Sequence, residues 1–394
     1  MKTVRDADVA GKRVLVRVDF NVPLDDTGEV EDDTRIKAAL PTLSYLLDKG
    51  ASLVVMSHLG RPKGRVEESL RLGPVAARLQ ELLGVEVRKL DQVVGREVEE
   101  ACAGLEPGGV VLLENLRFEP GEESNDPAFA DALARLGDLY VDDAFGAAHR
   151  AHASVTGVAE RLPAFAGLLM QKEVQALQGL IQEPARPFVA LLGGSKISDK
   201  LKLLGNFQEL VDILLIGGGM CFTILKSQGL EVGKSLCEDE LLPEVGEVME
   251  GAKKKRARIE LPVDLVVAPE FKEDAEGRVV AVGEIPPGWM GLDIGPRTVE
   301  AYVKSIEKAQ TVFWNGPMGV FEWERFQEGT RAVAEAIARS NAVSVAGGGD
   351  TVAAIERYGL EDGFTHISTG GGASMKFLEG RTLPGIAVLQ EREG

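Results

Sequence analysis

The chain has 394 residues, which at about 150 residues per domain predicts two or three domains. Its 62 acidic and 44 basic residues give a net charge of −18, and this balance argues against nucleic acid or an anionic membrane as a general partner, because phosphate groups need basic surface. Hydrophobic residues make up 44%, which is enough for ordinary globular cores, whereas 5% aromatic residues leave few rings for stacking bases.

The cysteines and the N-terminal segment indicate the compartment. Three cysteines (Cys102, Cys221 and Cys237) lie far apart without a CxxC pair, which argues against a disulfide framework or a thiolate zinc site and favours a reducing compartment. The first twenty residues carry charges throughout and lack the apolar core of a signal peptide, and no run of 18 apolar residues occurs. We therefore expect a soluble, cytoplasmic protein.

Short apolar runs rich in β-branched residues alternate with helical patterns along most of the chain. The predicted strands are, in order, Arg13–Val18, Ser52–Met56, Val110–Leu113, Leu139–Val141, Phe188–Leu192, Ile213–Ile216, Val312–Trp314, Val343–Ala346 and His366–Ser368. Predicted helices include one capped by Thr34 that runs toward Leu47, Leu72–Leu83 ending at Gly84, and one begun by Asp126-Pro127 with Gly137 just past its end. This alternation predicts an α/β fold of parallel sheets flanked by helices.

A single helical stripe in the middle of the chain marks a domain boundary. Met170, Val174, Leu177 and Ile181 recur at helical spacing, and the proline-containing segment 183–187 follows them. We interpret residues 170–185 as a helix leading into a short connector. It would separate an N-terminal domain, 1–169, from a C-terminal domain, 186–380, each long enough to form its own core.

The residues just after each strand are informative because parallel sheets bind ligands beyond the carboxyl ends of their strands. In the first half these tails are Asp19–Asn21, Ser57–Arg61, Glu114–Arg117 and Asp142–Arg150. Three of the four deliver an arginine, and Arg35 lies near the first. A lone arginine usually pairs with a surface acid. Arginines that recur after several strands, at the same edge of the sheet, instead predict an anion site, because the guanidinium is a rigid fork of donors for carboxylate or phosphate.

The corresponding tails in the second half carry glycine. They are Gly193–Lys196, Gly217–Gly219, Asn315–Gly319, Gly347–Thr351 and Thr369–Gly372. Any single loop of this kind is typical of a tight turn between strand and helix. Five in one domain favour a nucleotide cradle, because glycine lets a ligand approach the backbone N–H groups. Gly348–Thr351 is predicted to open a helix, whose free N–H groups would attract phosphate.

Four other patterns were weighed and given structural interpretations. The segment 229–235 nearly matches a Walker A loop, but it is one residue short and follows a helix. The basic run 253–258 is typical of a solvated helix end in an acidic chain. His149 and His152 have helical spacing but no evident third ligand for zinc. Asp142-Asp143 is adjacent on an extended strand, which favours hydrogen-bonding roles at the strand end over an acid/base pair.

Taken together, the motifs resemble those of the phosphoglycerate kinase family, in the family's order and over nearly the whole chain. The matching segments are VRVDFNVP, DDTRI, SHLGRPKG, LLENLRFEPGEE, DAFGAAHRAHAS, GGSKISDK, IGGGM, WMGLDIGP, FWNGPMGVFE, GGGDT and HISTGGGAS. One small departure is Ser195, where alanine is usual; it adds a hydroxyl and should not remove activity.

This resemblance implies two Rossmann-like lobes, each a parallel sheet flanked by helices, joined by a hinge helix at 170–185. The C-terminal segment 381–394 would pack on the N-terminal lobe. The implied reaction is reversible phosphoryl transfer between ATP, with Mg²⁺, and the carboxylate of 3-phosphoglycerate, giving 1,3-bisphosphoglycerate and ADP. The family is also usually monomeric.

The resemblance also implies site residues, each carried over by its motif. For 3-phosphoglycerate in the N-terminal lobe they are Asp19, Phe20, Asn21, Arg35, His58, Leu59, Gly60, Arg61, Arg117 and Arg150. For the nucleotide in the C-terminal lobe they are Lys200, Gly219, Gly291, Glu322, Gly348, Gly349, Asp350 and Thr351, with Asp350 as the magnesium ligand. The implied catalytic groups are Arg35, Lys196, Lys200, Gly348 and Gly349. Two other interpretations stay open: a different acyl-phosphate kinase or ATP-grasp-type ligase, and a two-lobed anion-binding protein without catalysis.

Overall fold

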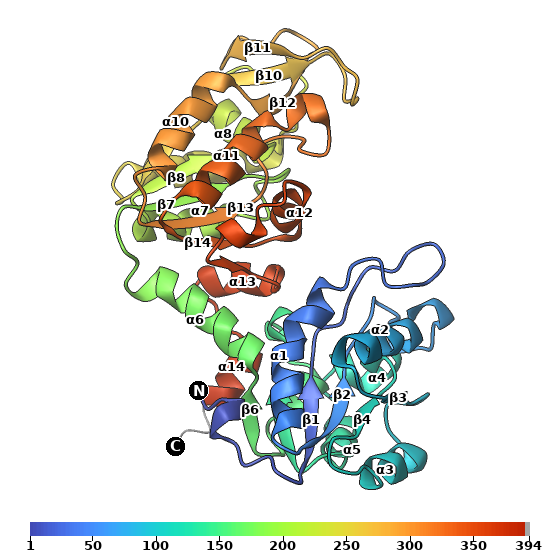
Figure 1. The fold of residues 1–394 in the computed structure, drawn as a ribbon. Coiled ribbons are helices and arrows are strands. Elements are labelled where there is room, and N and C mark those ends of the chain that lie inside the picture. Colours follow the sequence, from blue (N-terminus) through green and yellow to red (C-terminus); the bar gives the residue numbers. More distant parts are fainter. Residues whose placement is uncertain (391–394) are drawn as a thin grey trace. The chain divides into compact units, whose positions relative to one another are not determined.

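The computed structural model describes residues 1–390 and contains two compact units (Figure 1). Unit 1 comprises Met1–Gln175 and the C-terminal segment from Arg381, and unit 2 comprises Ala176–Gly380. Their boundary falls within helix α6, Leu168–Gln182, which overlaps the helix predicted at 170–185. Residues 391–394 of the predicted C-terminal segment lie outside the described residues. No helix in the described part of the chain is long and apolar enough to cross a membrane.

Unit 1 is built on a six-stranded sheet in the order β3-β4-β2-β1-β5-β6, with every neighbouring pair parallel. The strands are β1 Arg13–Arg17, β2 Ser52–Met56, β3 Val87–Lys89, β4 Val110–Leu112, β5 Leu139–Asp142 and β6 Ala164–Ala166. The helices are α1 Thr34–Asp48, α2 Gly73–Leu83, α3 Arg96–Ala103, α4 Pro120–Glu123, α5 Pro127–Ala134 and α14 Pro384–Gln390. The predicted α/β class is therefore confirmed for this unit.

Burial on both faces explains why the central strands of unit 1 read as continuous apolar runs. Alternate residues of β1, Val14 and Val16, join one core cluster with Leu43 of α1 and Leu79 of α2. Leu15, between them, is also fully buried. Helix α14 packs against β6, and the N–H of Gly385 donates to the carbonyl of Ala148, so the chain returns to this unit at its C-terminal end.

Local signals predicted some helix ends correctly and others not. Gly84 ends α2 with a left-handed φ of 68°, and the Asp126 carboxylate accepts a hydrogen bond from the Phe129 N–H at 2.9 Å as the N-cap of α5. Two predictions were wrong by small shifts. Asp33, not Thr34, is the N-cap of α1, and α5 ends at Ala134, before Gly137. Gly137 is instead needed for packing, because a Cβ there would lie 2.9 Å from the Cβ of Leu15.

Unit 2 repeats the architecture with a six-stranded parallel sheet in the order β15-β14-β13-β7-β8-β9. The strands are β7 Phe188–Leu192, β8 Ile213–Ile216, β9 Arg258–Glu260, β13 Thr311–Asn315, β14 Val343–Ala346 and β15 His366–Ile367. The helices are α7 Leu201–Leu210, α8 Met220–Ser227, α9 Leu242–Ala252, α10 Pro296–Ile306, α11 Glu328–Arg339, α12 Gly349–Arg357 and α13 Gly372–Leu378. Trp314 of β13 is the largest buried side chain of the core.

A second, antiparallel sheet in unit 2 was not predicted from the sequence. It has the order β11-β10-β12, formed by β11 Arg278–Ala281, β10 Asp264–Ala268 and β12 Met290–Ile294. Its three strands follow one another along the chain without an intervening helix, so strand–helix alternation gives no signal here. The edge strands β3, β6 and β9, of three residues each, were also not predicted.

The near-match to a Walker A loop and the basic run have the structural roles expected of them. The segment 229–235 follows helix α8, whereas a Walker A phosphate loop would follow a strand, so the segment is not such a loop. The basic run 253–258 begins just past α9. In it Lys253 pairs with Glu250, Lys255 with Glu209 and Arg256 with Asp212. The basic charges are thus balanced on the surface by neighbouring acids.

Two glycines of unit 2 provide a matched test of packing. Gly205 lies inside α7 with nothing within 4 Å of an added Cβ, whereas a Cβ at Gly363 would lie 2.8 Å from the Cα of Ala338. We expect Gly205→Ala to raise the free energy of unfolding by about 0.5–1 kcal/mol and Gly363→Ala to lower it by about 1–3 kcal/mol. Urea unfolding followed by tryptophan fluorescence measures both, because Trp289, Trp314 and Trp323 all lie in unit 2. Shifts of the same sign would contradict this account.

Candidate active site

In unit 1 the predicted site residues lie where the strand order reverses. From β1 the chain proceeds to β2 on one side of the sheet, and β5 lies on the other side. Asp19–Asn21 follow β1, and Asp142-Asp143 end β5, so both segments lie at the carboxyl edge beside this switch point. Open parallel sheets bind ligands at such points.

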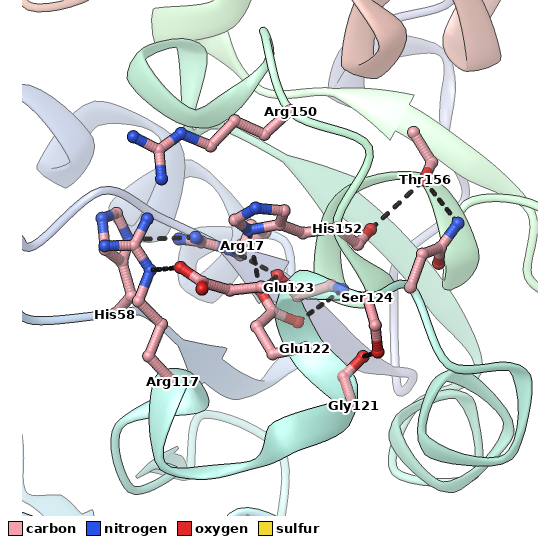
Figure 2. A network of polar contacts seen from close by, with 12 residues as sticks. Arg17, His58, Arg117, Gly121, Glu122, Glu123, Ser124, Arg150, His152 and Thr156 are labelled. Carbon is pink, nitrogen blue, oxygen red and sulfur yellow. Dashed lines mark hydrogen bonds and ion pairs between the residues drawn. The ribbon is translucent and has the colours of Figure 1, made fainter. Parts of the chain in front are cut away.

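Arginine side chains gather around His58 at this edge. Arg17, Arg117, Arg150 and Arg35 all lie close enough to His58 to affect its pKa. Figure 2 shows the first three together with the imidazole. Of the predicted arginines, Arg35 pairs with Asp19 at 3.2 Å, and Arg61 is exposed. The structure thus brings the predicted arginines Arg35, Arg117 and Arg150 around one histidine, as an anion site requires.

Arg17 is the most buried member of this group and was not predicted from the sequence. It is 1% exposed at the end of β1, and its Nη2 lies 3.1 Å from Nδ1 of His58. The available signal was a charged residue directly after the apolar run Val14–Val16, because arginine is almost never fully buried without a partner.

His58 is neutral in this environment. Burial lowers its pKa well below the ordinary value, and the surrounding guanidinium charges lower it further, with Arg17 contributing most. Burial and the nearby Arg150 also lower the pKa of Arg117 to about 10, so Arg117 keeps its charge at neutral pH. The site therefore attracts anions through its arginines, while His58 can offer only a neutral hydrogen bond.

Hydrogen bonds to the backbone hold the loop that carries His58. The Asn21 Oδ1 accepts from the Gly60 N–H at 2.8 Å, and the Arg117 Nη1 donates to the Gly60 carbonyl at 2.6 Å. Asn115, fully buried and not among the predicted site residues, bonds both the N–H and the carbonyl of Leu59. The side chains of Leu59 and Phe20 are buried in the core, so these two predicted residues can offer a ligand only their backbone.

Asp142 and Asp143 have the hydrogen-bonding roles expected of them. Asp142 accepts from the Ala144 N–H, and Asp143 accepts from the N–H groups of Leu169 and Met170 at the start of α6. Burial raises the pKa of Asp142 to about 7 and that of Asp143 to about 6. They hold backbone in place at the switch point.

Unit 2 has its own switch point, between β7 and β13, and here the glycines pack against one another. The N–H of Gly193 donates to the Asn315 carbonyl, and that of Gly194 donates to the Pro317 carbonyl. A Cβ on Gly193 would clash with the Pro317 carbonyl oxygen. Close backbone packing therefore accounts for some of the glycines that the sequence analysis assigned to a ligand.

A cavity of about 480 Å³ opens beside these loops. It brings together four of the predicted nucleotide residues, Gly219, Gly291, Glu322 and Asp350, with Ser195. Much of its wall is apolar and comes from Phe222, Leu236, Leu265, Phe271, Met290, Leu292, Met318 and Phe321. Strands β10 and β12 supply part of this wall, so the unpredicted antiparallel sheet shapes the cavity. Gly291 is required there because a Cβ would clash with the ring of Phe222.

The remaining predicted residues surround the loops at the edge of the parallel sheet. The Lys200 Nζ donates to the carbonyls of Gly193 and Asn315 at 2.6 and 3.2 Å, and burial lowers its pKa to about 8. Gly348 is the N-cap of α12 with a φ of 97°, and Thr351 is buried, with its hydroxyl oxygen accepting from the Gly316 N–H at 2.7 Å. Lys196 is exposed. Thr351 thus holds a loop of the site in place.

The position of Asp350 suits a magnesium ion that is bound partly by the protein and partly by a phosphorylated ligand. Among residues 1–390, no group of three or more histidine, cysteine, aspartate or glutamate side chains could hold a metal ion. Asp350 is an exposed carboxylate in the first turn of α12 and lines the cavity. Magnesium is commonly held by one or two carboxylates together with substrate phosphates. Asp350 therefore suits an ion that arrives with a phosphorylated ligand.

Comparison with known proteins gives one consistent family. The family model described as phosphoglycerate kinase matches residues 4–381. The phosphoglycerate kinase of Rubrobacter xylanophilus is 59% identical over 392 residues, covering 100% of this chain and 99% of that protein. That of Moorella thermoacetica is 57% identical, covering 99% of each.

Solved structures agree with the sequence relatives. Phosphoglycerate kinase from Coxiella burnetii matches with a TM-score of 0.91 at 42% identity, covering 100% of this chain and 99% of the other. The enzyme from Pyrococcus horikoshii OT3 matches with a TM-score of 0.86 at 34% identity, covering 99% and 98%. These matches confirm the fold class of two α/β units with parallel sheets.

The buried Asp142 should make the stability of unit 1 depend on pH. Its pKa is raised in the folded state, so between pH 4 and pH 7 the folded protein holds a proton that the unfolded chain has lost, and stability falls as pH rises. Asp142→Asn cannot ionise at this position. We therefore expect the free energy of unfolding of the variant, measured relative to that of the wild type, to be higher at pH 8 than at pH 5 by about 1 kcal/mol or more. Urea unfolding followed by circular dichroism tests this, with the tryptophan signal of unit 2 as the internal control. An equal effect at both pH values would contradict it.

Proposed function

The chain belongs to the phosphoglycerate kinase family, and on that premise we propose that it catalyses reversible phosphoryl transfer between MgATP and 3-phosphoglycerate. The products are ADP and 1,3-bisphosphoglycerate, and the reverse direction is the ATP-forming step of glycolysis. The observation that supports this most directly is chemical complementarity. Unit 1 carries an arginine cluster around the neutral His58, and unit 2 carries an apolar cavity edged by glycine loops, Lys200 and Asp350.

The N-terminal domain, predicted as residues 1–169 together with the C-terminal segment from 381, would bind the acceptor. Asp19 and Asn21 would hold the hydroxyl and carboxyl region of 3-phosphoglycerate, with Arg35 near its carboxylate. The phosphate would lie among His58, Arg61, Arg117 and Arg150. The guanidinium groups supply charge and paired donors, and the loop hydrogen bonds of Asn21 keep the Gly60 backbone in place for binding.

The C-terminal domain, predicted as residues 186–380, would bind the nucleotide. Gly219 and Gly291 would line the adenine slot and Glu322 would hold the ribose hydroxyls, since all three face the cavity. The phosphates would lie at Lys200 and the N–H groups of Gly348 and Gly349, where the nine-residue helix α12 begins and its dipole favours negative charge. Asp350 would coordinate magnesium, and Thr351 would support the loop.

The proposed chemistry requires positive charge and alignment more than proton transfer. The attacking group is a carboxylate with an ordinary pKa of about 4, so it is ionised at neutral pH and needs no general base. The transition state spreads charge over three phosphoryl oxygens, and Arg35, Lys196, Lys200 and the α12 amides would stabilise it. Magnesium, when bound at Asp350, would neutralise charge on the phosphates.

Because donor and acceptor are assigned to different units, we propose that the units close before transfer and that α6 is the hinge. Closure would exclude water that could otherwise accept the phosphoryl group. A cross-link that prevents closure should leave the binding of each single substrate intact and abolish turnover, whereas full turnover would refute the closure. Cytoplasmic location and a monomeric state remain predictions.

A coupled assay separates the proposed activity from its alternatives. With 3-phosphoglycerate and MgATP or MgGTP as the only substrates, we expect ADP or GDP to form when an auxiliary enzyme removes the product. A ligase would require an added amine or thiol, and a pure anion receptor would not bind ADP saturably. ADP formation that depends on a further acceptor would overturn the proposal.

Arg35 tests the role of charge at the migrating group. We expect Arg35→Ala to lower kcat by at least tenfold with a small change in KM, because the proposed interaction forms chiefly in the transition state. Steady-state kinetics with each substrate varied in turn measures this. A raised KM with near-normal kcat would show instead that Arg35 acts in ground-state binding.

Lys200 should set a pH limit on nucleotide use. Burial lowers its pKa to about 8, so its amine loses the charge that attracts phosphate as pH rises through that value. We expect kcat/KM for MgATP to fall above about pH 8, since this ratio reports groups of the free enzyme. Lys200→Arg, which stays charged, should be less active but should lack this fall. An unchanged alkaline limb in the arginine variant would contradict the assignment.

A further inference from the structure

A buried carboxylate lies beneath the arginine cluster of unit 1 and has no role in the proposed reaction. Glu122, at 0% exposure, projects from the four-residue helix α4. Its Oε1 accepts from the Ser154 hydroxyl at 2.6 Å, and its Oε2 accepts from the Ser154 N–H at 3.0 Å. His152 Nδ1 lies 3.6 Å from Oε1. Both carboxylate oxygens are therefore engaged, and Figure 2 shows them turned toward the centre of the network.

Ser154 connects this carboxylate to Arg17. The Arg17 Nε donates to the Ser154 Oγ at 2.9 Å, while the same hydroxyl donates its proton to Glu122. Arg17 Nη1 donates to the Val18 carbonyl. The guanidinium, 1% exposed, is thus held on two edges. A buried cation requires such partners, because desolvation without them would cost several kcal/mol.

The third contact of Arg17 determines the tautomer of His58. Its Nη2 lies 3.1 Å from Nδ1 of His58. A guanidinium only donates hydrogen bonds, so Nδ1 must be the acceptor. In a neutral imidazole the proton then lies on Nε2. The orientation of Arg17 therefore decides which ring nitrogen of His58 is the hydrogen-bond donor.

Glu122 stays ionised in this network. Burial alone would raise its pKa, but the nearby His152, the charge of Arg17 and the hydrogen bonds from Ser154 outweigh that effect and lower the pKa below the ordinary value. The negative charge placed against Arg17 offsets part of the repulsion among the buried guanidinium groups.

We propose that Glu122 is a positioning residue for the anion site: through Ser154 it holds Arg17 against His58 and so keeps Nε2 of His58 as a donor for the phosphate of the acceptor substrate. The identity of that phosphate rests on the proposed function. The effect of Glu122 on the tautomer rests on the hydrogen bonds alone.

Glu122→Gln is the direct test, because it keeps the shape but removes the charge. A glutamine has one acceptor oxygen for the two donors of Ser154, so the hydroxyl must turn and its bond to Arg17 must change. Long-range proton–nitrogen correlation spectra of the 15N-labelled, substrate-free protein report the tautomer, and with 4 histidines the signals are assignable by substitution. We expect the wild type to show His58 with its proton on Nε2 and Glu122→Gln to gain a population protonated on Nδ1.

Kinetics supply the second readout. We expect Glu122→Gln to raise KM for 3-phosphoglycerate about tenfold and to leave KM for MgATP within twofold, since only unit 1 is altered. Ser154→Ala breaks the same connection with a smaller change, so it provides the test if the buried Glu122 variant fails to fold. Glu119→Gln, a partly exposed acid just before α4, is the matched control and should change neither the tautomer nor either KM.

These measurements distinguish a failure of the Glu122 inference from a failure of the proposed function. A wild type with the His58 proton on Nδ1, or variants that keep both the wild-type tautomer and KM, would overturn the inference. A changed tautomer with an unchanged KM would overturn its connection to substrate binding. A wild type with the expected tautomer but no turnover of 3-phosphoglycerate would contradict the proposed function and leave the positioning of His58 supported.

Discussion

The burial of Arg17 at the carboxyl end of β1 is the constraint around which the arginine cluster of unit 1 is organised. A guanidinium that is 1% exposed needs partners on every edge, and Ser154, the Val18 carbonyl and His58 provide them. The neighbouring groups adapt to this buried guanidinium: the pKa of His58 is lowered well below its ordinary value, and the pKa of Glu122 is lowered despite its burial.

Unit 2 uses the same topology with different chemistry. Its switch point is formed by glycine loops whose backbones bond one another, and its main cation, Lys200, is held by two carbonyls instead of by acids. Carbonyl partners do not offset the burial of an amine as a carboxylate would, so the pKa of Lys200 is lowered. The pKa of Lys200, about 8, therefore lies below that of the buried Arg117 in unit 1, about 10, so the lysine loses its charge at a lower pH.

Much of the candidate site could be predicted from the sequence because parallel sheets place strand tails at one edge. That rule led to Asp19, His58, Arg117 and Gly348 without coordinates. It could not lead to Arg17, Glu122 or Asn115, because their importance comes from burial and from partners far away in the chain. It also missed the β10–β12 sheet, which walls the cavity but has no strand–helix alternation.

The amino-acid order by itself determined the α/β class, most central strands and the residues that follow them, because hydrophobic periodicity and glycine placement are local properties. Only the tertiary structure decided which glycines serve backbone packing, such as Gly193, and which line a cavity, such as Gly219. It alone decided the protonation of His58 and Lys200. Those states depend on desolvation and on charges brought together by folding, which no local pattern records.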